Sequence, residues 1–173
     1  GLPPEAIQCV TGSGGTIGDA LVADKRIRKV TFTGSMEVGE HICRVAGLKR
    51  VTMELGSNSP LIVMPDADMA KVVAGTVSSG FSNAGQVFIS AQRVIASKEI
   101  YGDYLDALTE GVKALSTGNP LDGTVKMGPM VRAQDAVRVD EWINEAVGAG
   151  ARTVYGGGFE GAADHQRCGY QGD

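Results

Sequence analysis

The chain has 173 residues, of which 43% are hydrophobic and 21% charged, and its formal net charge is -4. This balance is typical of a folded globular protein, and the mild acidity gives no reason to expect a nucleic acid or a membrane surface as partner. No apolar run approaches the roughly 18 residues that a membrane helix needs. Three widely spaced cysteines, Cys9, Cys43 and Cys168, argue against a disulfide scaffold and favour a reducing cytoplasm. The sequence starts at Gly1, without an initiator Met or a signal-peptide pattern, so we expect processing or a fragment.

The first part of the chain alternates short β-branched segments with helical patterns. Strands are predicted at 6–10, 29–32, 50–55 and 60–64, and helices at 17–23 and 37–46. A βαβαβ order of this kind predicts an α/β fold with one parallel sheet.

The second part of the chain is more helical. Asp66 or Asp68 can cap a helix that runs towards Asn83. Further helices are predicted at 103–116 and 134–149, strands at 92–97 and 153–155, and a loop at 118–123. From Gly156 onward the apolar pattern stops, which predicts a loop.

Two glycine-containing segments join a predicted strand to a predicted helix. The first, residues 12–18, nearly fits the dinucleotide fingerprint but has Ile17 where the last glycine belongs. The second runs from Gly34 to Gly39 and places a serine hydroxyl, that of Ser35, at the helix start. Free N–H groups at a helix start can bind phosphate, but glycines also serve in ordinary turns. Spacing alone leaves both interpretations open.

Longer motifs occur in a fixed order along the chain. They are Phe-Thr-Gly-Ser at 32–35 with Gly39, Val-Thr-Met-Glu-Leu-Gly-Ser-Asn-Ser-Pro at 51–60, Phe-Ser-Asn-Ala-Gly-Gln-Val at 81–87, Gly-Asn-Pro-Leu-Asp at 118–122 and Met-Gly-Pro-Met at 127–130. Together they resemble the aldehyde dehydrogenase superfamily over residues 1–158. The wording Gly-Ser-Asn-Ser-Pro at 56–60, with Ile-Ser-Ala-Gln-Arg at 89–93, is similar to its lactaldehyde and non-phosphorylating glyceraldehyde-phosphate branch.

The resemblance implies an internal fragment with two parts. Residues 1–56 would be the latter part of a Rossmann-like dinucleotide-binding domain. Residues 57–173 would be the first part of the catalytic domain, with an atypical tail at 160–173. It also implies oxidation of a small aldehyde to an acid with NAD or NADP, in a cytoplasmic enzyme that forms a homo-oligomer when intact. In such an enzyme a cysteine thiolate attacks the aldehyde, and a glutamate activates the water that releases the acid.

The resemblance also assigns site residues. Glu54 matches the general base. The cofactor-binding positions are Gly12, Phe32, Thr33, Gly34, Ser35, Gly39, Leu55 and Gly56.

The position of the nucleophile is held by Phe88, whose ring cannot form a thiolate or a thioester. None of the three cysteines replaces it by motif, and His165 with Cys168 is too small a set for a metal site, so no metal is expected. We therefore expect the chain to be inactive as written. Three alternatives remain: a piece of a working dehydrogenase whose cysteine was replaced deliberately or by error, a non-catalytic cofactor-binding or regulatory paralogue, and a fragment without function.

Overall fold

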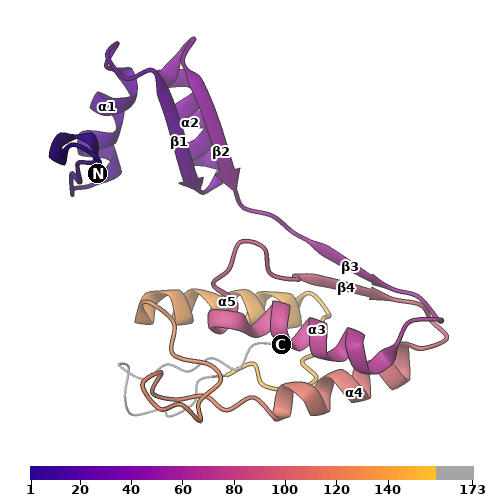
Figure 1. The fold of residues 1–173 in the computed structure, drawn as a ribbon. Helices are drawn as coiled ribbons and strands as arrows, with labels where there is room; N and C mark the ends of the chain where they lie inside the picture. Colours follow the sequence, from indigo (N-terminus) through magenta and orange to yellow (C-terminus); the bar gives the residue numbers. More distant parts are fainter. Residues whose placement is uncertain (159–173) are drawn as a thin grey trace. The chain divides into compact units, whose positions relative to one another are not determined.

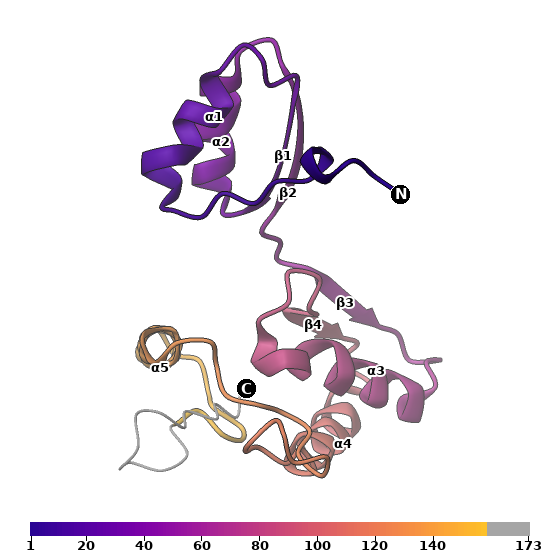
Figure 2. The same cartoon turned by 60° about the vertical axis from the view of Figure 1, so that its left-hand side comes forward.

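The computed structural model describes residues 1–158, which form two compact units that meet between Gly56 and Ser57 (Figure 1). Each unit contains a two-stranded parallel sheet together with helices, as a view turned by 60° also shows (Figure 2). In the part of the chain that the structure describes, no helix is long and apolar enough to cross a membrane.

The first unit is built on one β-α-β arrangement. Strand β1 (Lys29–Gly34) pairs with β2 (Arg50–Leu55) from Lys29 opposite Arg50 to Gly34 opposite Leu55, and helix α2 (Met36–Ala46) connects them. Helix α1 (Asp19–Ala23) continues directly from a π-helical turn at Gly14–Gly18. One face of the sheet and both helices share a small core of Val22, Val30, Phe32, Ile42, Val45, Ala46 and Met53.

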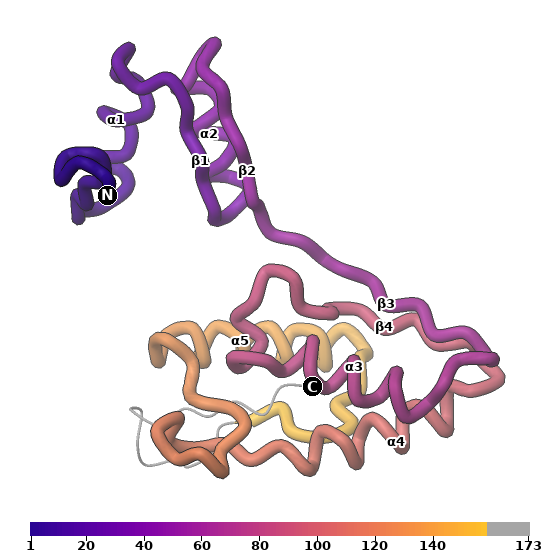
Figure 3. Tube along the Cα trace, in the orientation of Figure 1, coloured from indigo at the N-terminus to yellow at the C-terminus, as the bar shows by residue number. Residues whose placement is uncertain are grey.

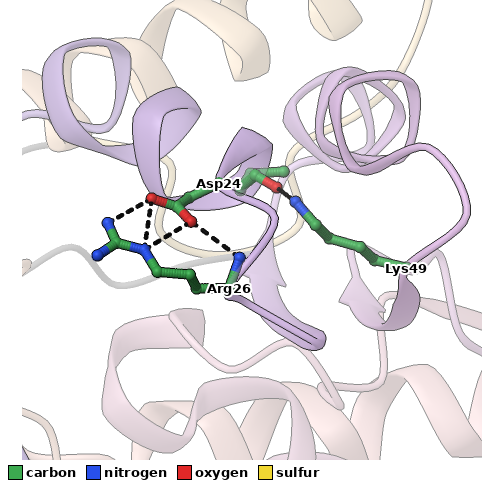
Figure 4. A network of polar contacts seen from close by, with 4 residues as sticks. Asp24, Arg26 and Lys49 are labelled. Carbon is green, nitrogen blue, oxygen red and sulfur yellow. Dashed lines mark hydrogen bonds and ion pairs between the residues drawn. The ribbon is translucent and has the colours of Figure 1, made fainter.

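Polar contacts hold the corner between α1 and β1 (Figure 4). The Asp24 carboxylate accepts from the backbone N–H of Arg26 at 2.8 Å and from its guanidinium at 2.6 Å. These donors hold the pKa of Asp24 well below its usual range. The Lys49 ammonium donates to the carbonyl of Val22, which satisfies a carbonyl at the end of α1.

The second unit repeats the β-α-β arrangement with different strands. Strand β3 (Pro60–Val63) pairs in parallel with β4 (Arg93–Ala96), and α3 (Met69–Phe81) lies between them in sequence. Asp68 caps α3, because its carboxylate accepts from the backbone N–H of Lys71 at 3.2 Å. The helices α4 (Tyr101–Lys113) and α5 (Ala133–Gly148) follow, and α4 packs along α3 (Figures 1 and 2).

Three sequence predictions about strands are wrong. Residues 6–10 form no strand: a 3-10 turn covers Pro4–Ala6, and although Ile7 has extended dihedral angles, no ladder partner lies beside it in residues 1–158. Residues 153–155 form no strand for the same reason. The predicted single sheet is two separate sheets in the structure. Only residues 56–59 separate β2 from β3, and two strands that pair in parallel need a connection of about a dozen residues or more.

Other predictions are confirmed by the observed elements. The strand at 50–55 has the predicted bounds, and the two predicted helices nearest the chain's end lie within two or three residues of α4 and α5. The expected tail at 160–173, with His165 and Cys168, lies outside the described residues.

Candidate functional site

The junction between β1 and α2 forms a helix start with a serine cap. Ser35 precedes α2, its hydroxyl accepts from the backbone N–H of Val38 at 3.4 Å, and its carbonyl accepts from the N–H of Gly39 at 3.0 Å. Gly34 ends β1 against the ring of Phe32, where a Cβ would lie 2.4 Å from the ring carbon Cζ. The chain therefore enters α2 with its first N–H groups directed along the helix axis, the arrangement that favours anions.

Close packing between α2 and β2 depends on Gly39. This residue is buried, and a Cβ there would lie 2.7 Å from Cδ2 of Leu55. A glycine at this point lets the first turn of α2 approach the end of β2. Leu55, predicted as a cofactor residue, thus contacts the helix that Ser35 caps.

A pocket of about 730 Å³ lies within the first unit, beside these elements. Its walls come from the π-helical turn, α1, β1 and α2, and most are apolar. They include Gly14, Gly15, Gly18, Leu21, Val22, Ile27, Val30, Phe32, Val38 and Ile42. Pockets of roughly 300–1,000 Å³ are typical of small-molecule and cofactor sites.

Phe32 is the predicted cofactor residue that lines this pocket. Gly12 does not line it and instead approaches Ile17, whose Cδ1 would lie 3.1 Å from a Cβ at Gly12. Gly39 lies on the same helix as the pocket residues Val38 and Ile42, and Ser35 caps the start of that helix.

Sequence reasoning missed the polar residues of the pocket, among them Asp19 and His41. The His41 ring nitrogen Nε2 lies 2.8 and 3.0 Å from the two carboxylate oxygens of Asp19, so this pair joins α1 to α2. His41 lies exposed on α2. No motif connects two residues that are 22 positions apart, so the pairing had no sequence signal.

A third polar wall residue, Glu37, occupies the first turn of α2. The pKa of Glu37 is lowered because its carboxylate accepts from its own backbone N–H and from the Ser35 hydroxyl. This side chain therefore supplies negative charge at the end of the helix where an anion is favoured.

Glu54, the predicted general base, lies one residue before the end of β2 and opposite Thr33 in the ladder. Its neighbour Met53 packs on the core, so Glu54 projects from the other face of the sheet, and it is exposed. A carboxylate in this position is open to water.

Phe88, at the predicted nucleophile position, lies in the loop between α3 and β4 that the tube in Figure 3 traces. Its side chain is 52% exposed, and its carbonyl accepts from the Ser57 hydroxyl at 2.9 Å. Upstream, Asn83, Ala84 and Gly85 all have positive φ angles, of 52°, 55° and 73°. Glu54 belongs to the first unit and Phe88 to the second.

The remaining candidates for chemistry are few. Cys9 and Cys43 are exposed, and Cys9 lies outside any strand. Within residues 1–158, no three His, Cys, Asp or Glu side chains gather closely enough to hold a metal ion.

Comparison with known proteins identifies the family. A model described as the aldehyde dehydrogenase family matches residues 1–170. The chain belongs to the aldehyde dehydrogenase family. This family comprises oxidoreductases that use NAD or NADP, as the motifs at 32–39 and 51–60 predicted.

Individual relatives agree with the predicted branch. The 3-sulfolactaldehyde dehydrogenase of Priestia aryabhattai is 44% identical over 162 residues, which are 94% of this chain and 34% of the relative. The glyceraldehyde-3-phosphate dehydrogenase of Methanocaldococcus jannaschii, solved with NADP, superimposes with a TM-score of 0.85 at 34% identity. The superposition covers 87% of this chain and 33% of that enzyme's chain. The betaine aldehyde dehydrogenase of Staphylococcus aureus, solved with NAD+, gives a TM-score of 0.84 at 29% identity over 90% of this chain and 31% of its own. The α/β fold of this family is thereby confirmed, and the chain spans about a third of the length of these proteins.

Proposed function

We propose that this chain is part of an NAD(P)-dependent aldehyde dehydrogenase in which the nucleophile has been replaced, so that the chain does not oxidise aldehydes. We also propose that it binds the cofactor weakly. The observation that carries the proposal is Phe88, a half-exposed phenyl ring at the position where the motif at 81–87 leads to the family's cysteine. A hydrocarbon ring has no lone pair with which to attack a carbonyl carbon. It also fills space that the aldehyde carbon would need.

Residues 1–56 are proposed to contribute the cofactor site. A dinucleotide joins an aromatic base to an anionic pyrophosphate. The apolar pocket walls suit the base, and the start of α2, with Gly34, Ser35 and Gly39, suits the pyrophosphate. The cofactor, when bound, supplies the hydride acceptor. Glu37 opposes the pyrophosphate, because its pKa is lowered and it stays charged at neutral pH.

Glu54 is proposed as the general base inherited from the family. Its exposed carboxylate at the end of β2 can accept a proton from water. In a family member with the cysteine, that water would attack a thioester. With Phe88 in place no thioester forms, so Glu54 has no acyl group to act on. The natural partner is a small aldehyde, and the intact protein is proposed to form a homo-oligomer.

A second candidate is a cofactor-binding or regulatory paralogue without catalysis. It is favoured by the contrast between an intact helix start and pocket in the first unit and the altered nucleophile position in the second. The two candidates differ in the affinity they predict.

Calorimetry with NAD and with NADP tests the cofactor part of the proposal. We expect binding no tighter than the millimolar range, about 4 kcal/mol, because the pocket of the first unit is open to solvent and the chain spans about a third of the length of its relatives. Glu37→Gln should tighten binding by removing the like charge, and Gly75→Ala, a change on α3 of the second unit, serves as the matched control. Micromolar affinity would contradict weak binding and support the regulatory paralogue.

Restoring the thiol tests the catalytic part. We expect the turnover rate of the Phe88→Cys variant with any short aldehyde to stay below about 1 per second, the lower end of the range typical of enzymes. A faster rate in this variant would show that the rest of the machinery is complete within the chain.

A further inference from the structure

The loop that carries position 88 begins with a strained turn. Asn83, Ala84 and Gly85 follow one another with φ angles of 52°, 55° and 73°. Asparagine and glycine tolerate the left-handed region, but the Cβ of alanine crowds the following carbonyl oxygen there. A backbone of this kind persists only where its surroundings hold it in place.

The side-chain amide of Gln86 holds this turn from two sides. The backbone N–H of Gln86 closes the left-handed turn onto the carbonyl of Asn83 at 3.1 Å, and Nε2 of the side chain adds a second bond to the same carbonyl at 3.0 Å. Its Oε1 accepts from the backbone N–H of Val131 at 3.0 Å, in the segment that leads into α5. One side chain thus bonds within the turn and also joins the turn to Val131, which is 45 residues further along the chain.

The loop is also held by residues 57–59, which belong to the motif at 51–60. The Ser57 hydroxyl donates to the carbonyl of Phe88 at 2.9 Å. The Arg93 guanidinium donates to the carbonyl of Asn58 at 3.0 and 3.2 Å, and the carbonyl of Ser59 accepts from the N–H groups of Gln92 and Arg93. Residues 57–59 therefore run alongside residues 88–93 and meet them at several points.

We propose that Ser57 and Gln86 are positioning residues that fix the main chain at position 88. They set the direction in which the side chain of that residue is presented, whichever residue stands there. The inference rests on the proposed function for the meaning of position 88 as the nucleophile position. Neither side chain is acidic, and both act through the main-chain geometry of residue 88.

Positioning has a chemical consequence for a thiol at this place. The Ser57 hydroxyl offsets the negative end of the carbonyl dipole of residue 88. Without that donor the carbonyl faces the nearby thiol uncompensated, which disfavours the thiolate and raises the pKa of the thiol. Ser57 therefore bears on the reactivity of residue 88 as well as on its place.

The test introduces a thiol by Phe88→Cys in the full chain and follows its alkylation by iodoacetamide across pH, resolved by peptide mass spectrometry. Cys9 and Cys43, exposed in the first unit, report on the same samples as internal references. With Ser57→Ala added, we expect the rate at position 88 and pH 7 to fall about threefold, as half a pKa unit requires. Ser57→Thr, which keeps the hydroxyl, should restore the profile.

Hydrogen exchange tests Gln86 in the same chain. Gln86→Ala should speed amide exchange at residues 83–90 and at Val131 about tenfold, since both bonds of the amide are lost. Gln86→Glu keeps the acceptor for Val131 and loses the donor to Asn83, so exchange should rise at 83–86 and stay unchanged at Val131.

Two results would overturn the proposal. One is an alkylation profile at position 88 that Ser57→Ala leaves unchanged. The other is an equal change in the alkylation rate of Cys43, which would mean that Ser57→Ala loosens the whole protein and does not act on position 88. Neither readout involves cofactor, aldehyde or turnover, so failure of the proposed function leaves this test intact.

Discussion

Both units of this chain join a strand and a helix through a short loop, but the loops obtain their shape differently. In the first unit, Gly34 and Ser35 lead from β1 into α2 with an ordinary serine cap and a glycine where packing demands one. In the second unit, the loop from α3 towards β4 passes through three left-handed residues and depends on the side chains of Gln86 and Ser57. The first loop is shaped by local backbone preferences, and the second by contacts with distant segments.

This difference suggests what each loop is for. A loop that presents backbone N–H groups to an anion needs a regular helix start, which local residues provide. A loop that presents one side chain to a substrate needs a fixed direction at one residue, and bonds from elsewhere in the fold provide it. Two of the four changes that follow, at Gly39 and Ala84, test this contrast, and the other two test contacts elsewhere in the second unit; they run from the largest expected effect to the smallest.

The largest effect is expected where the first unit requires glycine. Gly39→Val should lower the free energy of unfolding by about 2 kcal/mol, because the added carbons would collide with Leu55 across the α2–β2 contact. Gly75→Ala is the matched control, since Gly75 is an exposed residue of α3 with no atom near its Cβ position, and it should stabilise by about 0.5–1 kcal/mol. Urea unfolding measures both. Equal effects of the two changes would contradict the packing role of Gly39.

The next effect concerns the packing of α3 against α4 in the second unit. The buried hydroxyl of Tyr104 donates to Oγ1 of Thr76 at 3.0 Å, and Thr76 in turn donates to the carbonyl of Val72 at 2.8 Å. Tyr104→Phe should cost about 1 kcal/mol, because an acceptor inside the unit loses its partner. Tyr101→Phe, at an exposed tyrosine of the same helix, should cost nothing measurable in the same thermal melts. A neutral Tyr104→Phe would mean that this bond contributes little to the α3–α4 contact.

A smaller effect of opposite sign is expected in the strained loop. Ala84→Gly should stabilise the protein by about 0.5 kcal/mol, because the relief of the left-handed alanine exceeds the added entropy of the unfolded glycine. Ala70→Gly, on the exposed side of α3, should destabilise by about 1 kcal/mol. If both changes destabilise in urea titrations, the loop is not strained at this residue.

The smallest effect appears in acid. Asp135 is buried at the start of α5, and its carboxylate accepts from Arg132 at 3.1 Å and Arg138 at 3.0 Å, which lowers its pKa. A lowered folded-state pKa stabilises the fold above the unfolded value of about 4, and this contribution is lost as the pH falls through the folded value. Asp135→Asn should therefore weaken the acid dependence of the unfolding midpoint between pH 6 and 2. An unchanged pH profile in this variant would contradict a role for the pair of arginines.

The sequence predicts those parts of the fold that local chemistry determines. The bounds of β2 follow from its residue types, and so does a capping aspartate before α3, although only the structure chooses Asp68 over Asp66. Strand partners cannot be predicted in the same way, because an apolar segment such as 6–10 becomes a strand only when a neighbouring strand completes its hydrogen bonds. The pairing of β3 with β4 is likewise seen only in the structure.

The same limit applies to the candidate site. Glu54 and Phe88 could be singled out by motif, and so could the residues of the β1–α2 junction. The pairing of His41 with Asp19 and the bonds of Gln86 could not, since both join segments that are far apart in sequence and have no spacing rule. The positive φ of Ala84 likewise has no signal in residue type, because alanine disfavours it.

The central claim is that Phe88 removes the covalent step from an otherwise recognisable aldehyde dehydrogenase chain. The most direct measurement follows absorbance of reduced cofactor while pure protein is incubated with a panel of short aldehydes and either NAD or NADP. We predict no production above the rate without protein. Steady production of NADH or NADPH, proportional to protein concentration, would contradict the account and require another residue to act as the nucleophile.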